Sequence, residues 1–281
     1  MIKKNIMLLP LSLFLTACHS VMLEPKGMIA IAEKNVLITA VILMLLVVIP
    51  VITLTLVFAW RYREGNKKAT YAPNWSHSNW IETICWTVPR AIIGVLGTIT
   101  WISTHQLDPY RSLNDAEPLK IQAIALEWKW LFIYPEEKIA TVNYVQFPVN
   151  RPVRFLITAE GPMNSFQIPA LAGQIYAMAG MQTKLHLIAN EIGDYQGISA
   201  NFSGDGFSDM MFIARASSAA EYAQWVKTAQ HSKTQLSLTT YKKLMQPSTK
   251  VAVQYFALAN KEIFNLAIMK SMMPMTEWEN A

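Results

Sequence analysis

Two long apolar runs mark the first part of the chain. Val36–Trp60 is a run of 25 residues without a charged side chain, and a second apolar run covers Ile84–Thr104. With a rise of about 1.5 Å per residue, a helix of the first run exceeds the roughly 30 Å hydrocarbon core of a bilayer. The pattern predicts transmembrane helices over 36–60 and 81–104, joined by a loop over 61–80.

From about Pro118 the hydrophobic residues recur at every second position, which is the pattern of half-buried strands. Four such segments read LKIQAIAL, TVNYVQF, VRFLIT and KLHLIAN, and turn-forming clusters such as NRP and EGPMN separate them. Many short strands at close spacing are typical of an all-β sandwich or barrel. This part of the fold is expected to cover 118–216.

After the strands, the hydrophobic spacing becomes that of helices. Ser217 and Ser218 are candidate N-caps for a helix with the sequence AAEYAQWVKTAQ. Further helical pieces are predicted at about 238–246 and 251–273. The predicted fold class is therefore a membrane α-hairpin of two transmembrane helices, followed by an all-β domain and a C-terminal helical tail over 217–281.

Residues 1–17 have the pattern of a bacterial signal peptide. Lys3 and Lys4 precede a short apolar run, too brief to span a bilayer, which ends in the sequence LTAC. This ending resembles the lipobox of bacterial lipoproteins, which implies cleavage before Cys18 and a lipid on its thiol. The alternative is an ordinary signal anchor with an incidental cysteine. Lipidation is the favoured interpretation, and it leaves residues 18–35 as an external N-terminal segment.

Composition favours a membrane protein, because 52% of the residues are hydrophobic and only 15% are charged, against about 25% charged in an average soluble protein. Residues 1–104 carry nine Lys and Arg against four Asp and Glu, which accounts for the whole net charge of +5. A basic nucleic-acid surface is thereby excluded. The loop 61–80 is the most basic short loop, which predicts that it is cytoplasmic and that the β domain is external. Arg90 within the second run is expected to snorkel or to face a partner protein.

The order of these parts, together with several longer stretches, resembles subunit II of the haem–copper respiratory oxidases, and in detail the quinol oxidases of the cytochrome bo type. The stretches are PNWSHSNWIE with WTVP, EWKWLFIYPE, ACHSVMLEPKG and the long block from Met163 to Met210. The resemblance covers nearly the whole chain and implies that the β domain is a cupredoxin-like sandwich. In the cytochrome c oxidase branch of the family, this domain holds a two-copper centre.

The copper ligands of that branch can be placed on this chain residue by residue. The pattern is a His before a strand with the residues SF, followed by C-x-E-x-C-x-x-x-H-x-x-M. The six positions are occupied here by Asn164, Ser199, Asn201, Ser203, Phe207 and Met210. Soft copper sites depend on thiolates and imidazoles, and only the methionine keeps its type. We therefore expect no metal, no cofactor and no redox centre in this chain, and a loop that is kept as scaffold.

The other candidate groups are expected to be structural. His186 lies on the polar side of KLHLI and is expected on a solvated strand face, and neither His105 nor His231 is at ligand spacing from another histidine. The aromatic run EWKWLF is expected to pack in the interior. The methionine-rich end IMKSMMPM lacks His and Cys partners and is expected to be a helix face or a frayed tail.

Glu82 is the most prominent ionisable group, because it lies at the predicted cytoplasmic end of the second span. Two roles remain open: a carboxylate favoured by the helix dipole in the first turn, or a proton-entry group. The matching Glu of the family lies at the entrance of a proton channel in subunit I, which adds weight to the second role. No catalytic residue is expected in this chain apart from this possible proton entry.

The resemblance implies a subunit of a proton-pumping terminal ubiquinol oxidase, which oxidises quinol and reduces oxygen to water. Haem b, haem o and one copper are then expected in subunit I. Expected partners are subunit I, further oxidase subunits, ubiquinol and the lipid bilayer, but neither nucleic acid nor cytochrome c. The expected location is the bacterial inner membrane, with a lipid anchor, two spans and the large domain in the periplasm. Two alternatives are a copper-carrying subunit II of a cytochrome c oxidase and a free-standing membrane lipoprotein scaffold.

Overall fold

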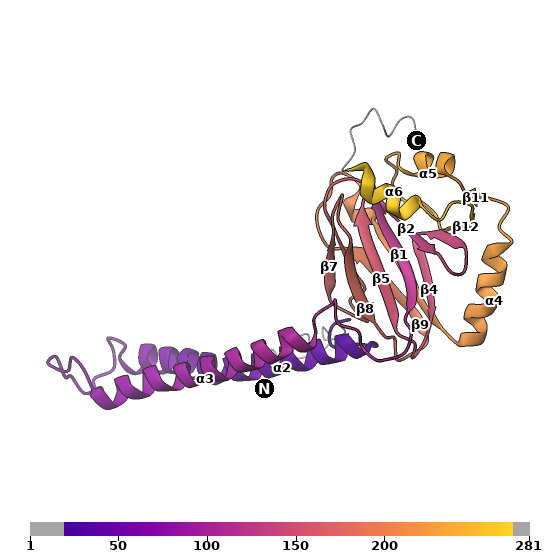
Figure 1. Ribbon diagram of the computed structural model, residues 1–281. Helices are drawn as coiled ribbons and strands as arrows, with labels where there is room; N and C mark the ends of the chain where they lie inside the picture. The colour runs from indigo at the N-terminus through magenta and orange to yellow at the C-terminus, as the bar shows by residue number, and fades with distance from the viewer. Residues whose placement is uncertain (1–19, 272–281) are drawn as a thin grey trace, which may run out of the picture. The chain divides into compact units, whose positions relative to one another are not determined.

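Figure 1 shows the computed structural model, in which residues 20–271 are described. The chain divides into two compact units. One unit is the helical hairpin, Glu33–Asp108, and the other combines residues 20–32 with residues 109–271. The predicted signal peptide and Cys18 lie outside the described residues.

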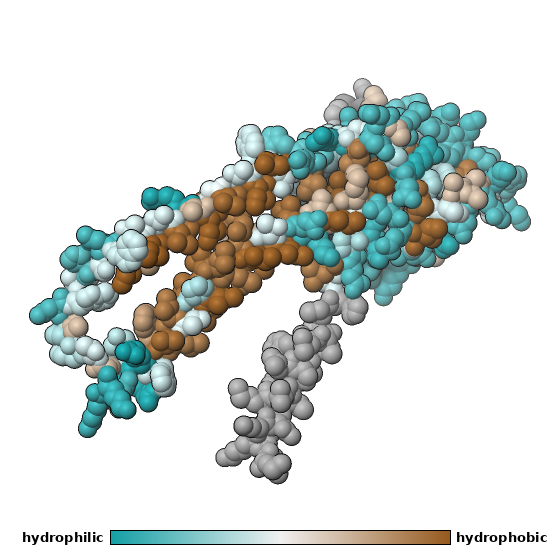
Figure 2. All heavy atoms as spheres, turned by 90° about the horizontal axis from the view of Figure 1, so that it is seen from below, coloured by the Kyte–Doolittle hydropathy of each residue, from teal (hydrophilic) through white to brown (hydrophobic). Residues whose placement is uncertain are grey.

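Two long helices form the hairpin. α2 (Met28–Arg61) and α3 (Asn79–Gln106) contain the two predicted apolar runs and extend beyond them at both ends. Both helices are long and apolar enough to cross a membrane. Their large apolar side chains lie mostly exposed, and Figure 2 shows the resulting, mainly hydrophobic surface of the hairpin. Such a surface requires lipid or another protein against it, because a large exposed apolar patch is unfavourable in water.

Two β-sheets form the core of the second unit. The seven-stranded sheet has the order β11-β12-β3-β2-β1-β5-β8, and the five-stranded sheet has the order β4-β10-β9-β6-β7. Their strands are β1 (Leu119–Leu126), β2 (Lys129–Tyr134), β3 (Ile139–Val142), β4 (Tyr144–Pro148), β5 (Val153–Ala159), β6 (Asn164–Gln167), β7 (Gln174–Ala177), β8 (Thr183–Leu187), β9 (Gly193–Ser199), β10 (Met211–Ser217), β11 (Gln235–Leu236) and β12 (Gln254–Leu258). The pairs β1–β5, β4–β10 and β11–β12 are parallel, and the other pairs are antiparallel. The two-sheet arrangement confirms the predicted all-β sandwich.

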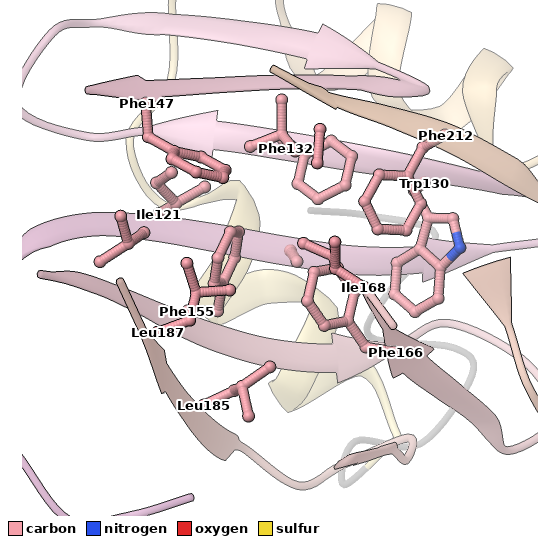
Figure 3. Packing of buried hydrophobic residues seen from close by; sticks show 14 of the residues in the cluster. Ile121, Trp130, Phe132, Phe147, Phe155, Phe166, Ile168, Leu185, Leu187 and Phe212 are labelled. Atoms are coloured by element: carbon pink, nitrogen blue, oxygen red, sulfur yellow. The ribbon is translucent and has the colours of Figure 1, made fainter. Parts of the chain in front are cut away.

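The seven-stranded sheet is buried on both faces. Along β1, Ile121 and Ala123 belong to the core between the sheets, whereas Ile124 and Leu126 pack with the C-terminal segments. Successive residues of a strand point to opposite faces, so the tail must cover the outer face for both sets to be buried. Figure 3 shows the core between the sheets. Its aromatic rings make contacts with centroids 5.0–6.2 Å apart, and the residues are Trp130, Phe132, Phe155, Phe166 and Phe212.

The C-terminal tail is only partly helical. Its helices are α4 (Ala219–Gln230), α5 (Leu238–Leu244) and α6 (Ile263–Lys270). The predicted helix over 251–273 is wrong in its first part, because Gln254–Leu258 form β12, which pairs antiparallel with β3. Phe256 of β12 lies opposite Ala140 and is buried. Strand preference depends on the neighbouring strand and on burial, and both are supplied here by a segment far earlier in the chain.

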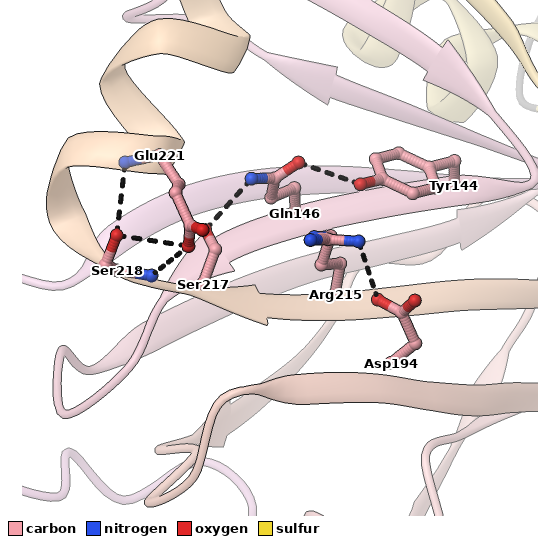
Figure 4. Close-up of polar contacts among 7 residues, drawn as sticks. All are labelled: Tyr144, Gln146, Asp194, Arg215, Ser217, Ser218 and Glu221. Atoms are coloured by element: carbon pink, nitrogen blue, oxygen red, sulfur yellow. Dashed lines mark hydrogen bonds and ion pairs between the residues drawn. The ribbon is translucent and has the colours of Figure 1, made fainter.

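The start of α4 combines a local signal with a long-range one. Ser218 is the N-cap and forms a capping box with Glu221, in which each side chain accepts a hydrogen bond from the backbone N–H of the other residue. Ser217, the other predicted candidate, is buried, and its hydroxyl accepts a hydrogen bond of 2.9 Å from Gln146 (Figure 4). Tyr144 donates to the same Gln146 at 2.8 Å. This network ties the end of β10, directly before the N-cap of α4, to β4.

Candidate functional site

The predicted former metal loop lies between β9 and β10 and is bonded to β6. Asn164 on β6 and Ser199 at the end of β9 are both buried, and Ser199 Oγ donates a hydrogen bond of 2.8 Å to Oδ1 of Asn164. The Asn164 amide nitrogen donates to the carbonyl oxygen of Pro162 at 3.0 Å. The backbone N–H of Ser199 donates to the carbonyl oxygen of Met210 at 3.2 Å. Three of the six predicted positions therefore lie together, and their polar side chains bond to protein atoms.

Two further positions lie within the loop, which contains the short 3-10 helix η2 (Phe207–Asp209). The Asn201 amide nitrogen donates to the carbonyl oxygen of Met163 at 2.9 Å, which fastens the loop to the segment before β6. The Phe207 ring packs edge-on against Phe202, with the ring centroids 5.7 Å apart. At these two positions, an amide and a phenyl ring hold the loop conformation by hydrogen bonding and by packing.

The donor atoms of the loop do not fit a soft metal. Met210 is 1% exposed and belongs to the core between the sheets, so its thioether is occupied by packing. The Ser203 hydroxyl is buried and has no hydrogen-bond partner among the described residues, but a neutral hydroxyl is a poor ligand for copper. The described residues contain no group of three or more His, Cys, Asp or Glu that could hold a metal ion.

Trp128 and the C-terminal tail close over the loop. The backbone of Trp128 has a φ of +62°, which is uncommon for a bulky residue, and its indole Nε1 donates to the carbonyl oxygen of Ser203 at 3.2 Å. A Cβ atom placed on Gly206 would lie 2.4 Å from the indole of Trp128 and 2.6 Å from the side chain of Thr249. Only glycine fits at this position, and the tail segment around Thr249 covers the loop.

The aromatic run that begins at Trp128 was predicted to be interior throughout, and this is only partly correct. Trp130 and Phe132 are fully buried and lie in the core between the sheets. Trp128 is only partly buried, because it precedes β2 and lies against the loop. Period-two spacing places residues 128, 130 and 132 on one face, but the positive φ of Trp128 takes it out of the strand.

The prediction for His186 is wrong. Its side chain is buried, with Nδ1 2.9 Å from the carbonyl oxygen of Pro109 and Nε2 accepting a hydrogen bond of 2.9 Å from Arg154. Because Nε2 accepts, Nδ1 carries the proton and donates to Pro109. His105 and His231 each bond a backbone carbonyl one turn earlier in the chain. All three histidines are therefore engaged in structural hydrogen bonds.

Sequence reasoning missed a buried lysine that holds the tail. Lys129 is 1% exposed, and its ammonium donates to the carbonyl oxygens of Glu127 at 3.1 Å and Gln246 at 2.9 Å and to Ser248 Oγ at 2.6 Å. Burial lowers the pKa of this ammonium, because all three acceptors are neutral oxygens and do not offset the loss of water. The contacts fix the tail segment that precedes Thr249.

A buried carboxylate makes a second attachment of the tail. The Glu160 side chain is 5% exposed and accepts a hydrogen bond from the hydroxyl of Tyr241 in α5. Its other oxygen pairs with the ammonium of Lys270 in α6 at 2.7 Å. Burial and the Glu160 carboxylate raise the pKa of Tyr241 well above its ordinary value, so the phenol stays neutral and donates. One side chain thereby holds two helices of the tail.

The hairpin carries a polar stripe on α3. Glu82 lies in the first turn, and Arg90 follows two turns later. Both side chains are exposed, and neither has an ion pair within residues 20–271. A hollow of about 580 Å³ lies along this stripe and is lined by Asn79, Glu82, Thr83, Trp86, Thr87 and Arg90. An exposed Glu and Arg on a helix of this length are costly in lipid, so the stripe requires a polar surface against it.

Comparison with known proteins agrees with this architecture. Residues 112–217 match the family described as cytochrome c oxidase subunit II, periplasmic domain, and residues 230–275 match the COX aromatic rich motif. The second match covers most of the tail, including β12, α5 and α6.

Several relatives are similar over most of the chain. Cytochrome bo(3) ubiquinol oxidase subunit 2 of Pseudomonas aeruginosa is 52% identical over 92% of this chain and 78% of the relative. Ubiquinol oxidase subunit 2 of Acetobacter aceti is 49% identical over 92% of this chain and 85% of the relative. Quinol oxidase subunit 2 of Bacillus cereus is 39% identical over 85% of this chain and 84% of the relative. With this identity and coverage, and with a cupredoxin-like domain behind a two-helix hairpin, the chain belongs to the family of ubiquinol oxidase subunit 2.

Proposed function

We propose that the chain is the second subunit of a terminal oxidase of the inner membrane that transfers electrons from ubiquinol to oxygen, and that it contains no redox centre. In the overall reaction, two ubiquinol molecules lose four electrons and four protons, and one oxygen molecule takes them up to form two waters. The observation that carries this proposal is the combination of relatives named ubiquinol oxidase subunit 2 with a former metal loop that lacks thiolates and imidazoles. Ubiquinol is apolar and can reach subunit I within the membrane, so electrons do not need to pass through a metal centre in this chain.

The proposal assigns the redox groups to a partner. Haem b, haem o and one copper belong to subunit I, which also binds ubiquinol. This chain supplies the hairpin against subunit I and an external domain. The exposed stripe with Glu82 and Arg90 supports a partner helix, because lipid alone would not compensate these charges.

Purification through a tag on this chain in mild detergent tests the assignment. We expect a multi-subunit complex with b-type haem absorbance and quinol-driven oxygen consumption. Oxidation of cytochrome c by the complex would favour the copper-carrying alternative, and a pure single chain without haem would favour the free-standing scaffold. Metal analysis of the external domain separates the first alternative directly, since that reading requires bound copper.

Glu82 is proposed as a proton-entry group. Its support is its position in the first turn of α3, in a hollow lined mainly by polar side chains and shared with Arg90. Glu82→Ala should slow proton uptake and quinol oxidation in reconstituted vesicles. Glu64→Ala, which removes an exposed carboxylate of the neighbouring loop, is the matched control. Unchanged proton uptake in Glu82→Ala would leave the carboxylate only its local effect on the helix start.

The N-terminal processing and the topology are also proposals. They place cleavage before Cys18, a lipid on its thiol, spans over 36–60 and 81–104, and the β domain over 118–216 with its tail in the periplasm. The basic loop 61–80 supports this orientation. The intact mass of the mature protein tests the lipid: a Cys18→Ser variant should lose the added mass, and an unmodified cysteine in the mature protein would contradict the assignment.

A further inference from the structure

An aromatic hollow lies at the turn between the two long helices. It has a volume of about 740 Å³, within the range of roughly 300–1,000 Å³ typical of small-molecule sites. Most of its lining is apolar, and the residues are Phe58, Tyr62, Thr70, Tyr71, Ala72, Pro73, Trp75 and Ile81. The polar stripe with Glu82 contributes none of these residues, so the hollow is separate from the proposed proton entry.

In the proposed topology, the hollow lies at the membrane interface. α2 is free of charge from Val36 to Trp60, and the first charged residue is Arg61. Phe58 and Tyr62, which line the hollow, therefore flank the end of the apolar segment. Tyrosine and tryptophan favour this depth in a membrane because their rings are apolar and their polar atoms reach water. An occupant of the hollow can reach both the acyl region and the head groups.

Four cationic residues are close in the sequence to residues that line the hollow. Arg61 and Arg63 flank the lining residue Tyr62, and Lys67 and Lys68 precede the lining residue Thr70. These four side chains are exposed, and none forms an ion pair with a carboxylate within the described chain. The segment between Arg61 and Ile81 holds a single acid, Glu64.

Hydrogen bonds fix the backbone of the turn that carries these cations. The side chain of Asn66 donates to the carbonyl oxygen of Arg61 at 2.5 Å and accepts from the backbone N–H of Lys68 at 3.1 Å. Arg63 donates to the carbonyl oxygen of Trp60 at 3.3 Å, and its guanidinium carbon lies 5.2 Å from the centre of the Trp60 ring. The cations are therefore carried by a short, bonded turn that also supplies residues of the apolar hollow.

We propose that this hollow binds an anionic phospholipid, with part of an acyl chain against the aromatic residues and the phosphate near Arg61, Arg63, Lys67 and Lys68. The charge complementarity and the depth at the interface favour a lipid of the adjoining leaflet. A loop of a partner subunit would have to bring its own carboxylates to the same place. The site is independent of how electrons reach the oxidase.

Photolabelling of the intact oxidase complex tests the site. The complex is reconstituted in phosphatidylcholine nanodiscs that contain a trace of phosphatidylglycerol with a photoactivatable diazirine on one acyl chain. Phosphatidylcholine with the same labelled chain is the reference probe. We expect phosphatidylglycerol to label the peptides covering residues 58–81 several-fold more than phosphatidylcholine. Equal labelling by the two lipids would overturn the proposal, because it would mean that the hollow is filled by bulk lipid alone.

Two variants remove the charge and the cavity separately. Arg61→Gln combined with Arg63→Gln should bring the labelling by phosphatidylglycerol down to the level of phosphatidylcholine, since each cation near an anionic lipid surface strengthens binding by roughly fivefold and the two together by about 25-fold. Ala72→Trp fills the hollow and keeps every charge, and it should abolish labelling by both probes. The matched control is Lys233→Gln with Lys261→Gln, which removes two exposed cations of the external unit and should leave labelling unchanged.

Subunit assembly and lipid labelling are measured on the same preparations. The variants and the wild type are compared at equal haem content. If Ala72→Trp prevents assembly while the double arginine variant assembles and is labelled like the wild type, the hollow is a contact for a partner subunit and the proposal fails. A double arginine variant that assembles and loses the preference for phosphatidylglycerol supports the proposal when Ala72→Trp also loses labelling. Unchanged labelling in an assembled Ala72→Trp complex would overturn the proposal, because the basic loop would then attract the lipid without the hollow.

Discussion

The hairpin and the β-rich unit differ in where their apolar surface is buried. In the β-rich unit, the rings around Phe166 contact one another and are shielded from solvent by the two sheets and the tail. In the hairpin, large side chains such as Leu56 and Trp86 are 65% and 70% exposed. The β-rich unit therefore contains its own hydrophobic core, whereas the hairpin depends on lipid and on other subunits.

Polar groups follow the same division. In the β-rich unit, buried polar side chains such as Lys129, Asn164 and His186 have partners within the chain. In the hairpin, the charged side chains of Glu82 and Arg90 are exposed and have no ion pair within the described residues. The β-rich unit therefore satisfies these buried polar groups by itself, while the hairpin exposes charged groups that need water or a partner.

The largest expected effect comes from the core between the sheets. Phe166→Ala should destabilise the β-rich unit by about 3–5 kcal/mol, because it removes a buried ring that contacts four others and leaves a cavity. Hydrogen exchange of β1 and β5 peptides in the full-length protein measures the loss. Leu56→Ala in the exposed surface of α2 should leave that exchange unchanged. An effect of equal size from Leu56→Ala would show that the two units are not independently stable.

The second-largest effect is expected where Glu160 attaches the C-terminal tail to the sheet. Glu160→Gln should destabilise α5 and α6 by about 2 kcal/mol, because it removes the charged partner of a mostly buried lysine and weakens the bond from Tyr241. Faster hydrogen exchange confined to the tail is the expected observation. Glu136→Gln, at an exposed carboxylate of the β2–β3 turn, is the control. Unchanged exchange in α6 would mean that apolar packing alone holds the tail.

The third prediction concerns Gly206, which allows Trp128 and the tail to pack closely on the loop between β9 and β10. Gly206→Ala should destabilise the loop and the tail segment above it by about 1–3 kcal/mol, because the new methyl group collides with Trp128 and Thr249. Gly193→Ala is a suitable control, since the nearest atom would be 3.4 Å away. Proteolysis between residues 200 and 210 reports the opening of the loop. Quinol oxidation should persist in any complex that assembles, and its loss in an intact complex would contradict the role of the loop as scaffold.

The smallest effect is expected at the start of α4 and depends on pH. Hydrogen bonds from the backbone and hydroxyl of Ser218 lower the pKa of Glu221 below its ordinary value. The carboxylate therefore stabilises the folded state above the ordinary glutamate pKa, and this contribution is lost as the pH falls through the lowered pKa. Glu221→Gln keeps the capping geometry without titrating. The wild type should melt at a higher temperature than the variant at neutral pH, and this difference should disappear at acidic pH. A difference that does not change with pH would contradict the proposed effect of Glu221 ionisation on stability.

Local patterns were sufficient to predict much of the molecule. The uncharged run at Val36–Trp60 predicted α2, and the four alternating segments predicted β1, β4, β5 and β8. The capping signal at Ser218 predicted the start of α4. The lost donor types at Ser199 and Phe207 needed no coordinates, because a hydroxyl and a phenyl ring are poor copper ligands in any conformation. These features depend on residues that are close together in the sequence.

Contacts between distant segments decided the rest. The burial of His186 depends on Arg154 and on the segment at Pro109, the state of β12 depends on β3, and Lys129 is bonded to the tail. The spacing of hydrophobic residues within one segment cannot predict these contacts, since the partners are brought together only when the sheet and the tail have formed. The sequence by itself determined which chemical groups the protein has and where the two long apolar helices lie, because side-chain chemistry and long hydrophobic runs are local features. The tertiary structure alone decided which of those groups are buried, paired or left for a partner, because burial is a property of the assembled chain.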